Sequence, residues 1–230
     1  MAAVTAKLVK ELRERTSAGM MDCKKALDAT DGDLDKAGEW LRTKGLAQAG
    51  KKASRVAAEG SVLSYIHMGG KIGVLLEVNC ETDFVSRGDD FQGFCRDIGM
   101  HIAAANPSYV SRDEVPEDAI AKERTLFEAE IREQGKPENI IQKIVDGKID
   151  KWMKEICLLD QEFVKPAEDG GKQTVEQVRI NIVQKTGENV QIRRFVRYVL
   201  GEGIEKKKEN LAEEVAKMQD AARAAAAPAS

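Results

Sequence analysis

The side chains best suited to chemistry gather in residues 79–87, which read NCETDFVSR and follow a strongly apolar run. Within this segment Cys80 is a candidate nucleophile, provided that a base such as His101 lies close enough to take its proton. No glycine-rich loop follows Cys80 to form an oxyanion hole, and a cysteine that ends an apolar run is more often a packing residue. His101 lies at the edge of an apolar helical stripe, where a core or interface histidine is the commoner role. The residues therefore favour packing over catalysis.

Four carboxylates around the same segment raise a second possibility, a divalent metal site. They are Glu81, Asp83, Asp89 and Asp90. Carboxylate oxygens suit magnesium and calcium, but this spacing does not fit an EF-hand loop, and some of the carboxylates are needed to cap the following helix. No CxxC pair suggests zinc, and neither GxxxxGK nor GxGxxG occurs to hold a phosphate. We expect no catalytic residue, no resident metal and no cofactor.

Two apolar features near these polar groups have an open interpretation. Phe84 lies in the middle of the acidic segment, and by pattern alone it either turns into the core, the safer guess, or is held outward. Met20 and Met21 are adjacent, and methionine suits both core packing and adaptable surface contacts. The pattern favours packing for one methionine and leaves the other undecided.

The composition indicates a folded, strongly charged protein. Of 230 residues, 42% are hydrophobic and 33% are charged, and 36 basic residues against 39 acidic ones give a net charge of −3. This balance disfavours direct nucleic-acid binding, which needs a basic excess. No apolar run approaches the roughly 20 residues that span a bilayer, and the beginning of the chain does not read as a signal peptide. We expect a cytoplasmic protein with no membrane contact, whose four cysteines are reduced and buried.

The pattern of elements predicts an α+β fold that begins with a small helical domain. Residues 1–54 read as three short helices in a bundle, the first capped by Thr5 and the third ended by Gly45. A weakly patterned linker, 45–60, follows, and the sequence leaves open whether it is helical. The bundle resembles a partner-binding module rather than a catalytic one.

Residues 55–205 are expected to form an α+β core domain. Apolar strands on either side of Gly69-Gly70 predict a tight antiparallel hairpin, and the second strand is apolar enough to be buried on both faces. A helix runs from Asp89 or Asp90 to a stop before Asn106. A protruding helical hairpin follows at about 117–157, and 189–201 supplies the last strand of a small antiparallel sheet. Residues 206–230 are expected to form a helical tail.

Two long stretches are specific enough to suggest a family. Residues 12–27, LRERTSAGMMDCKKAL, and 77–87, EVNCETDFVSR, resemble the two signatures of bacterial translation elongation factor Ts. The GKP turn at 135–137, QEFVKP at 161–166 and RRFVRYVLGEGIE at 193–205 are also similar to that family. The resemblance extends to about residue 205. Because only one strand-helix set is present, the chain resembles the shorter members, with a single core subdomain.

The resemblance implies a guanine nucleotide exchange factor that acts on elongation factor Tu by binding, without catalytic residues of its own. It implies a UBA-like N-terminal bundle that contacts the nucleotide domain of that GTPase through Met20 and Met21. It also implies that Thr82, Asp83, Phe84 and Val85 reach the magnesium and phosphate site and promote GDP release. His101 matches a position that faces another domain of the partner.

The resemblance and the small size of the sheet together predict self-association. A lone three-stranded sheet leaves an apolar face exposed, so we expect a homodimer, or a complex with two copies of each partner. A general adaptor or chaperone that binds through the helical bundle is the competing interpretation among non-enzymes.

Overall fold

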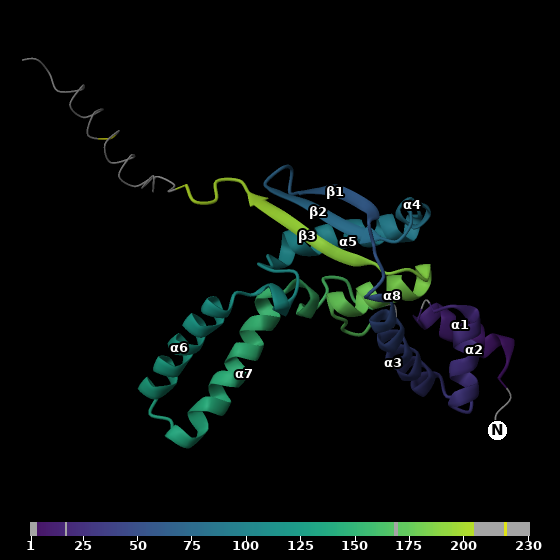
Figure 1. Ribbon diagram of the computed structural model, residues 1–230, viewed down its shortest axis with the longest axis horizontal. Helices are drawn as coiled ribbons and strands as arrows, with labels where there is room; N and C mark the ends of the chain where they lie inside the picture. Colours follow the sequence, from purple (N-terminus) through teal and green to yellow (C-terminus); the bar gives the residue numbers. More distant parts are fainter. Residues whose placement is uncertain (1–3, 17, 168–169, 205–218, 220–230) are drawn as a thin grey trace, which may run out of the picture. The chain divides into compact units, whose positions relative to one another are not determined.

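The computed structural model describes residues 4–16, 18–167, 170–204 and residue 219. The chain divides into two compact units, Met1–Val199 and Leu200–Ser230, and the helices and strands from α1 to β3 lie in the first. Its fold is α+β, as the sequence predicts, with a small antiparallel sheet, packed helices and a helical hairpin (Figure 1). The predicted helical tail, 206–230, lies outside the described residues except for position 219.

The N-terminal bundle consists of α1 (Ala6–Thr16), α2 (Met20–Ala29) and α3 (Leu34–Lys52). The Thr5 hydroxyl caps α1 by accepting the Leu8 amide at 3.3 Å, as predicted, and Asp33 caps α3 by accepting the amides of Asp35 and Lys36. Small and apolar side chains from all three helices enclose a separate core, formed by Leu12, Ala18, Cys23, Ala26, Leu27, Ala37 and Leu41.

The end of α3 differs from the prediction, because Gly45 lies inside the helix rather than at its C-terminus. Helix α3 continues to Lys52 and packs against α8 (Val175–Thr186). A Cβ atom on Gly45 would lie 1.8 Å from Nε2 of Gln184, whose side chain donates to the Leu41 carbonyl at 3.3 Å. The glycine is therefore explained by a close approach of two helices. The first half of the predicted linker, residues 45–52, is therefore helix.

The sheet has the order β1-β2-β3, with β1 (Glu59–His67), β2 (Ile72–Cys80) and β3 (Gln191–Val199) all antiparallel to their neighbours. The predicted tight turn joins β1 to β2, and Gly69 and Gly70 both have positive φ angles there, which glycine adopts without strain. The register places Leu63, Leu76 and Phe195 side by side on one face of the sheet.

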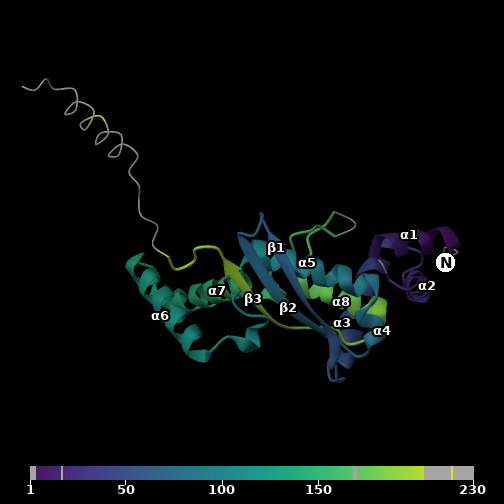
Figure 2. The same cartoon turned by 90° about the horizontal axis from the view of Figure 1, so that it is seen from above.

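Strand β2 is buried on one face only, so the prediction that both faces are buried is wrong. Val74, Leu76 and Val78 are buried, whereas Leu75 between them is 49% exposed. Helix α5 (Asp89–Ala105) packs on the buried face of β1 and β2, as the views in Figures 1 and 2 show. The apolar side chains of the opposite face, here called the open sheet face, are exposed. They are Val62, Ile66, Leu75, Val196 and Tyr198.

Gly60, at the start of β1, is required by a close approach of two backbones. Its φ is +142°, and a Cβ atom there would lie 2.1 Å from the Val78 carbonyl oxygen. Because neither the angle nor the contact suits an L side chain, Gly60→Ala should lower the free energy of unfolding by about 3 kcal/mol. Urea unfolding measures this value. Gly38→Ala is the matched control, because nothing surrounds that helical site and alanine should stabilise it by up to about 1 kcal/mol. Equal effects of the two substitutions would contradict the assignment.

The helical hairpin consists of α6 (Glu117–Glu133) and α7 (Glu138–Ile156), and it turns at the predicted GKP sequence, where Gly135 has φ +68°. Short 3₁₀ helices, η1 (Arg112–Glu114) and η2 (Leu158–Asp160), flank it. A third apolar core fills the hairpin and its base, with Val115, Ile131, Ile141, Val145, Ile149, Met153 and Cys157 buried. Among the residues that the structure describes, none of the helices combines the length and the apolar character needed to cross a bilayer.

Candidate functional site

The acidic and aromatic residues that follow β2 form a short helix, α4 (Asp83–Ser86), which with its cap Thr82 is here called the tip. Thr82 has an extended backbone, and its hydroxyl accepts the Val85 amide at 3.4 Å, as an N-cap does. The buried Ser86 closes the turn by donating its hydroxyl to the Asp83 carbonyl at 2.9 Å. The sequence TDFVS therefore builds a closed helical turn at the end of the strand.

The tip points one apolar side chain inward and one outward. Val85 packs against the apolar core of the sheet and α5, which includes Leu76, Val78 and Phe91, whereas Phe84 is 85% exposed. Asp83 is also exposed and forms an ion pair with Arg87, one turn further along. Because the turn fixes both directions, Phe84 and Asp83 are presented together on the surface. Of the two interpretations that the pattern allowed for Phe84, the outward one is correct.

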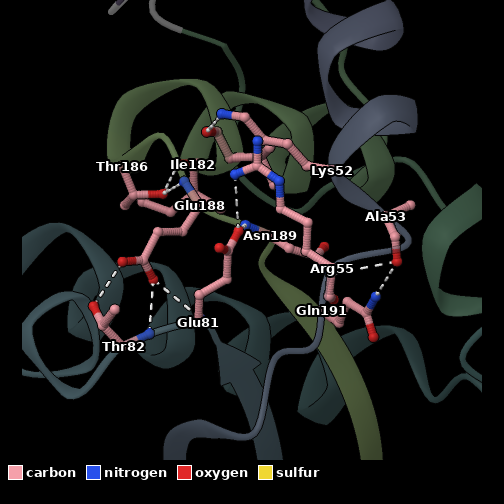
Figure 3. A network of polar contacts seen from close by, with 11 residues as sticks. Lys52, Ala53, Arg55, Glu81, Thr82, Ile182, Thr186, Glu188, Asn189 and Gln191 are labelled. Carbon is pink, nitrogen blue, oxygen red and sulfur yellow. Dashed lines mark hydrogen bonds and ion pairs between the residues drawn. The ribbon is translucent and has the colours of Figure 1, made fainter.

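The Glu188 carboxylate, just after α8, forms hydrogen bonds that hold the start of the tip in place. Its Oε2 atom accepts the amides of Glu81 and Thr82, each at 3.0 Å, and its Oε1 atom accepts the Thr82 hydroxyl at 2.6 Å (Figure 3). Sequence reasoning missed Glu188. It lies more than a hundred positions from the tip, and only the capping signal of the missed helix α8, Thr174 with Gln177, pointed to an element there.

The thiol of Cys80 is arranged for packing rather than for attack. It is buried and donates to the Thr82 carbonyl at 3.1 Å. Burial, with the Glu188 carboxylate nearby, raises the pKa of Cys80 to about 11, so the thiol stays protonated at neutral pH. The proposed base, His101, is engaged elsewhere by hydrogen bonds to Gln161 and Val164. The thiolate that nucleophilic catalysis needs is therefore not provided.

The carboxylates around the tip do not converge on a metal-sized site. Asp83 pairs with Arg87, Asp90 pairs with Lys185 at 2.6 Å, and Glu81 accepts the Asn189 amide at 2.7 Å. Across the described part of the chain, no group of three or more histidine, cysteine or acidic side chains is placed to hold an ion. Asp83 and Asp90 instead have a cation as partner and Glu81 has a backbone amide, while Asp89 lies in the first turn of α5.

Met20 and Met21 begin α2, and both side chains are exposed, while Cys23, Ala26 and Leu27 on the same helix face the bundle core. The expectation from pattern alone that one methionine packs inside is therefore wrong. Two adjacent exposed methionines form an adaptable apolar surface. Their contact with a partner stays a prediction.

His101 is placed differently from the expectation that it faces a partner, because its side chain is only 1% exposed. Its Nδ1 atom accepts the Val164 amide at 3.2 Å, which leaves the proton on Nε2 to be donated to the Gln161 side-chain oxygen at 2.9 Å. The ring also packs against Phe163. In this conformation His101 fastens residues 161–164 to α5, and the ring has no free surface for a direct contact.

This arrangement makes the stability of the chain depend on pH. Burial lowers the pKa of His101 below its ordinary value of 6.5, although the hydrogen bond to Gln161 acts in the opposite direction. A second proton, on Nδ1, would also face the Val164 amide. Just below pH 6.5 the unfolded chain therefore binds more protons than the folded chain. The contribution of neutral His101 to the free energy of unfolding is complete above this pH and is lost as the pH falls toward the pKa of the folded state. The slope is at most about 1.4 kcal/mol per pH unit. Unfolding free energies of wild type and His101→Gln at about pH 7.5 and 5.5 measure it. An equal pH dependence of both proteins would contradict the assignment.

Comparison with known proteins places this architecture in a family. The family model described as elongation factor TS matches residues 2–169. The chain is 62% identical over 217 residues to a protein named elongation factor Ts from Anaeromyxobacter sp. (strain Fw109-5), which covers 94% of this chain and 97% of the relative. It is 56% identical to the protein of that name from Desulforamulus reducens, over 94% of this chain and 98% of the relative. The Geobacter sulfurreducens protein of the same name is 57% identical, over 93% and 97% respectively. By the extent and the identity of these matches, the chain belongs to the elongation factor Ts family.

Proposed function

We propose that the chain is a guanine nucleotide exchange factor for elongation factor Tu and acts in the cytoplasm during translation elongation. Membership of the elongation factor Ts family supports the partner and the activity. The observation that carries the mechanism is the tip, which presents Phe84 at 85% exposure on a closed and supported turn. The activity is one of binding, in which no bond of a substrate is made or broken by this chain.

In the proposed mechanism, the Phe84 ring enters between elements of the GTPase beside its magnesium and phosphate site, with Asp83 next to it. Displacing the groups that hold the magnesium water shell weakens the binding of the magnesium ion. The negative charge of the diphosphate is then poorly neutralised. Exchange follows as a linkage effect, because the factor favours the empty GTPase and nucleotide favours dissociation of the factor. Thr82 and Val85 complete the contact as the cap and the inward anchor of the turn.

The N-terminal bundle supplies a second proposed contact. Met20 and Met21 lie exposed at the start of α2 and suit an apolar surface on the nucleotide domain of the GTPase. A contribution of His101 would run through residues 161–164, which it fastens to α5, rather than through the buried ring itself. The partner is a protein surface. A net charge of −3 offers nucleic acid no general attraction.

We also propose that two copies of the chain associate through the open sheet face. Its five apolar side chains lie on all three strands of one sheet, and Leu75 on the central strand is flanked by Ser64 and Val196. An exposed sheet face that carries several apolar side chains is a typical site for association with another sheet. The functional unit would then be a homodimer, or a complex with two copies of each partner.

Release of fluorescent GDP from purified elongation factor Tu tests the proposed function. The chain is added at about one-twentieth of the GTPase concentration, with excess unlabelled GDP. An exchange factor turns over and accelerates release from the whole GTPase population. An adaptor that only binds would release at most a stoichiometric fraction, and that result would reject the proposal in favour of the adaptor.

A further inference from the structure

We propose that Glu188 is a positioning residue for the tip, and that Glu188 and Asn189 together, here called the brace, fix the tip relative to the chain that leaves the N-terminal bundle. The consequence for GDP release rests on the proposed function. The structural part of the inference does not, because it concerns contacts within this chain.

The first step concerns the backbone just before the tip. The ladder between β1 and β2 ends at the pair Glu59 and Cys80, so the amides of Glu81 and Thr82 lie beyond strand pairing. Glu188 replaces the missing strand partner by accepting both amides, each at 3.0 Å. Hydrogen bonds to an ionised carboxylate are stronger than those between neutral groups. The direction in which the chain enters α4 is therefore set by Glu188.

The second step concerns the hydroxyl of Thr82, which has two roles at once. It accepts the Val85 amide as the N-cap of α4, and it donates to Glu188 at 2.6 Å. Because a cap works only in the right rotamer, the bond to Glu188 orients the same oxygen that closes the turn beneath Phe84. Glu188 thus acts on Phe84 through Thr82.

The third step is that Glu188 is itself held in place. Gly187 ends α8 in a left-handed conformation with φ +78°, and the Glu188 amide donates to the Thr186 hydroxyl at 3.3 Å. The neighbouring Asn189 is almost fully buried, and its amide donates to the Glu81 carboxylate at 2.7 Å. Residues 81–82 and 188–189 are therefore joined by reciprocal hydrogen bonds. Each segment supplies a carboxylate that accepts a backbone amide of the other (Figure 3).

The fourth step extends the brace to the N-terminal bundle. The side-chain amide of Asn189 donates to the carbonyls of Ala53 and Arg55, at 3.4 and 2.8 Å, directly after α3. Gln191 donates to the same Ala53 carbonyl at 3.3 Å (Figure 3). A carbonyl at a helix end has no partner within the helix, so these side chains satisfy it. The loop after α8 thereby holds both the exit of the bundle and the entry to the tip.

The test compares Glu188→Ala with the conservative Glu188→Gln, which keeps one oxygen for the two amides and an NH₂ group for the Thr82 oxygen. The matched control is Glu114→Ala, which removes a carboxylate that accepts the Val110 amide beside the helical hairpin. Two quantities are measured for each full-length variant. They are the hydrogen exchange of residues 81–86 in the free chain, and the dependence of GDP release from elongation factor Tu on the concentration of the variant.

For Glu188→Ala we expect faster amide exchange at residues 81–86, by about tenfold or more, because local opening becomes easier. The maximal rate of GDP release should fall by about tenfold, while the concentration for half-maximal release changes by less than about threefold. Glu188→Gln should stay within about threefold of wild type in all measurements, because glutamine has the same shape and keeps hydrogen bonds to the two amides and to Thr82. Glu114→Ala should leave residues 81–86 and GDP release unchanged.

Unchanged hydrogen exchange at residues 81–86 in Glu188→Ala would overturn the positioning role, whatever the GTPase does. Faster hydrogen exchange with unchanged GDP release would overturn its functional consequence. If wild type itself fails to release GDP, the proposed function fails, and hydrogen exchange still decides the positioning role. Should Glu188→Ala not fold, Glu188→Asp shortens the side chain by one methylene, leaves the Thr82 cap in place, and is judged by the same measurements.

Discussion

Phe84→Ala is expected to lower the maximal rate of GDP release from elongation factor Tu by at least about tenfold, which corresponds to about 1.4 kcal/mol. The ring is the largest apolar group of the tip and is 85% exposed, so its removal takes away the proposed contact with the partner and almost no contact within this chain. Stopped-flow measurement with fluorescent GDP gives the rate, and thermal unfolding should show no loss of stability.

Val56→Ala is the control for this prediction, because Val56 is an apolar side chain with a similar exposure of 83%. Its truncation should leave GDP release unchanged, since no role in the contact is assigned to it. A rate for Phe84→Ala equal to that of wild type would reject the proposed insertion of the Phe84 ring, while the exchange activity itself would stand.

Leu75→Glu is expected to dissociate the proposed homodimer, with a dissociation constant raised at least about 100-fold. A carboxylate at the centre of an apolar interface would be buried without a partner, at a cost of about 3 kcal/mol or more. Leu75 lies on the central strand and is 49% exposed in the single chain, so the folded chain tolerates the charge. Sedimentation equilibrium measures the change.

Val164→Glu is the matched control for the open sheet face, because Val164 is an apolar residue with 47% exposure outside the sheet. It should leave the association unchanged. A wild-type chain that sediments as a monomer would contradict the proposed homodimer. Equal dissociation by both substitutions would show that added charge, rather than the open sheet face, is responsible.

Much of the fold could be predicted from the sequence, because local chemistry determines it. Thr5 caps α1, the two glycines after β1 adopt positive φ angles, and Asn106 ends α5 in a left-handed conformation. The GKP turn separates the helices of the hairpin. In each case the residue that carries the signal either contacts a residue a few positions away or itself adopts the backbone angle that the turn requires.

The remaining features depend on partners distant in the sequence. Gly45 reads as a helix end, but it is small because Gln184 crosses it. Strand β2 reads as doubly buried, although one of its faces is open, because exposed apolar side chains on a strand give the same sequence pattern as buried ones. Glu188 resembles any exposed acidic residue until the fold brings it beneath Thr82. Helix α8 does carry a local signal, the capping box of Thr174 and Gln177 at its start.

The most direct test of the central claim is the acceleration of GDP release measured with magnesium at about 5 mM and again with excess chelator. If the chain works partly by disturbing the magnesium site, chelation performs that part in advance, so the acceleration factor should fall at least about tenfold without magnesium. A large factor with magnesium and a much smaller one without it is the predicted result. No acceleration in either condition would contradict the exchange function, and an equal factor in both would contradict the magnesium mechanism.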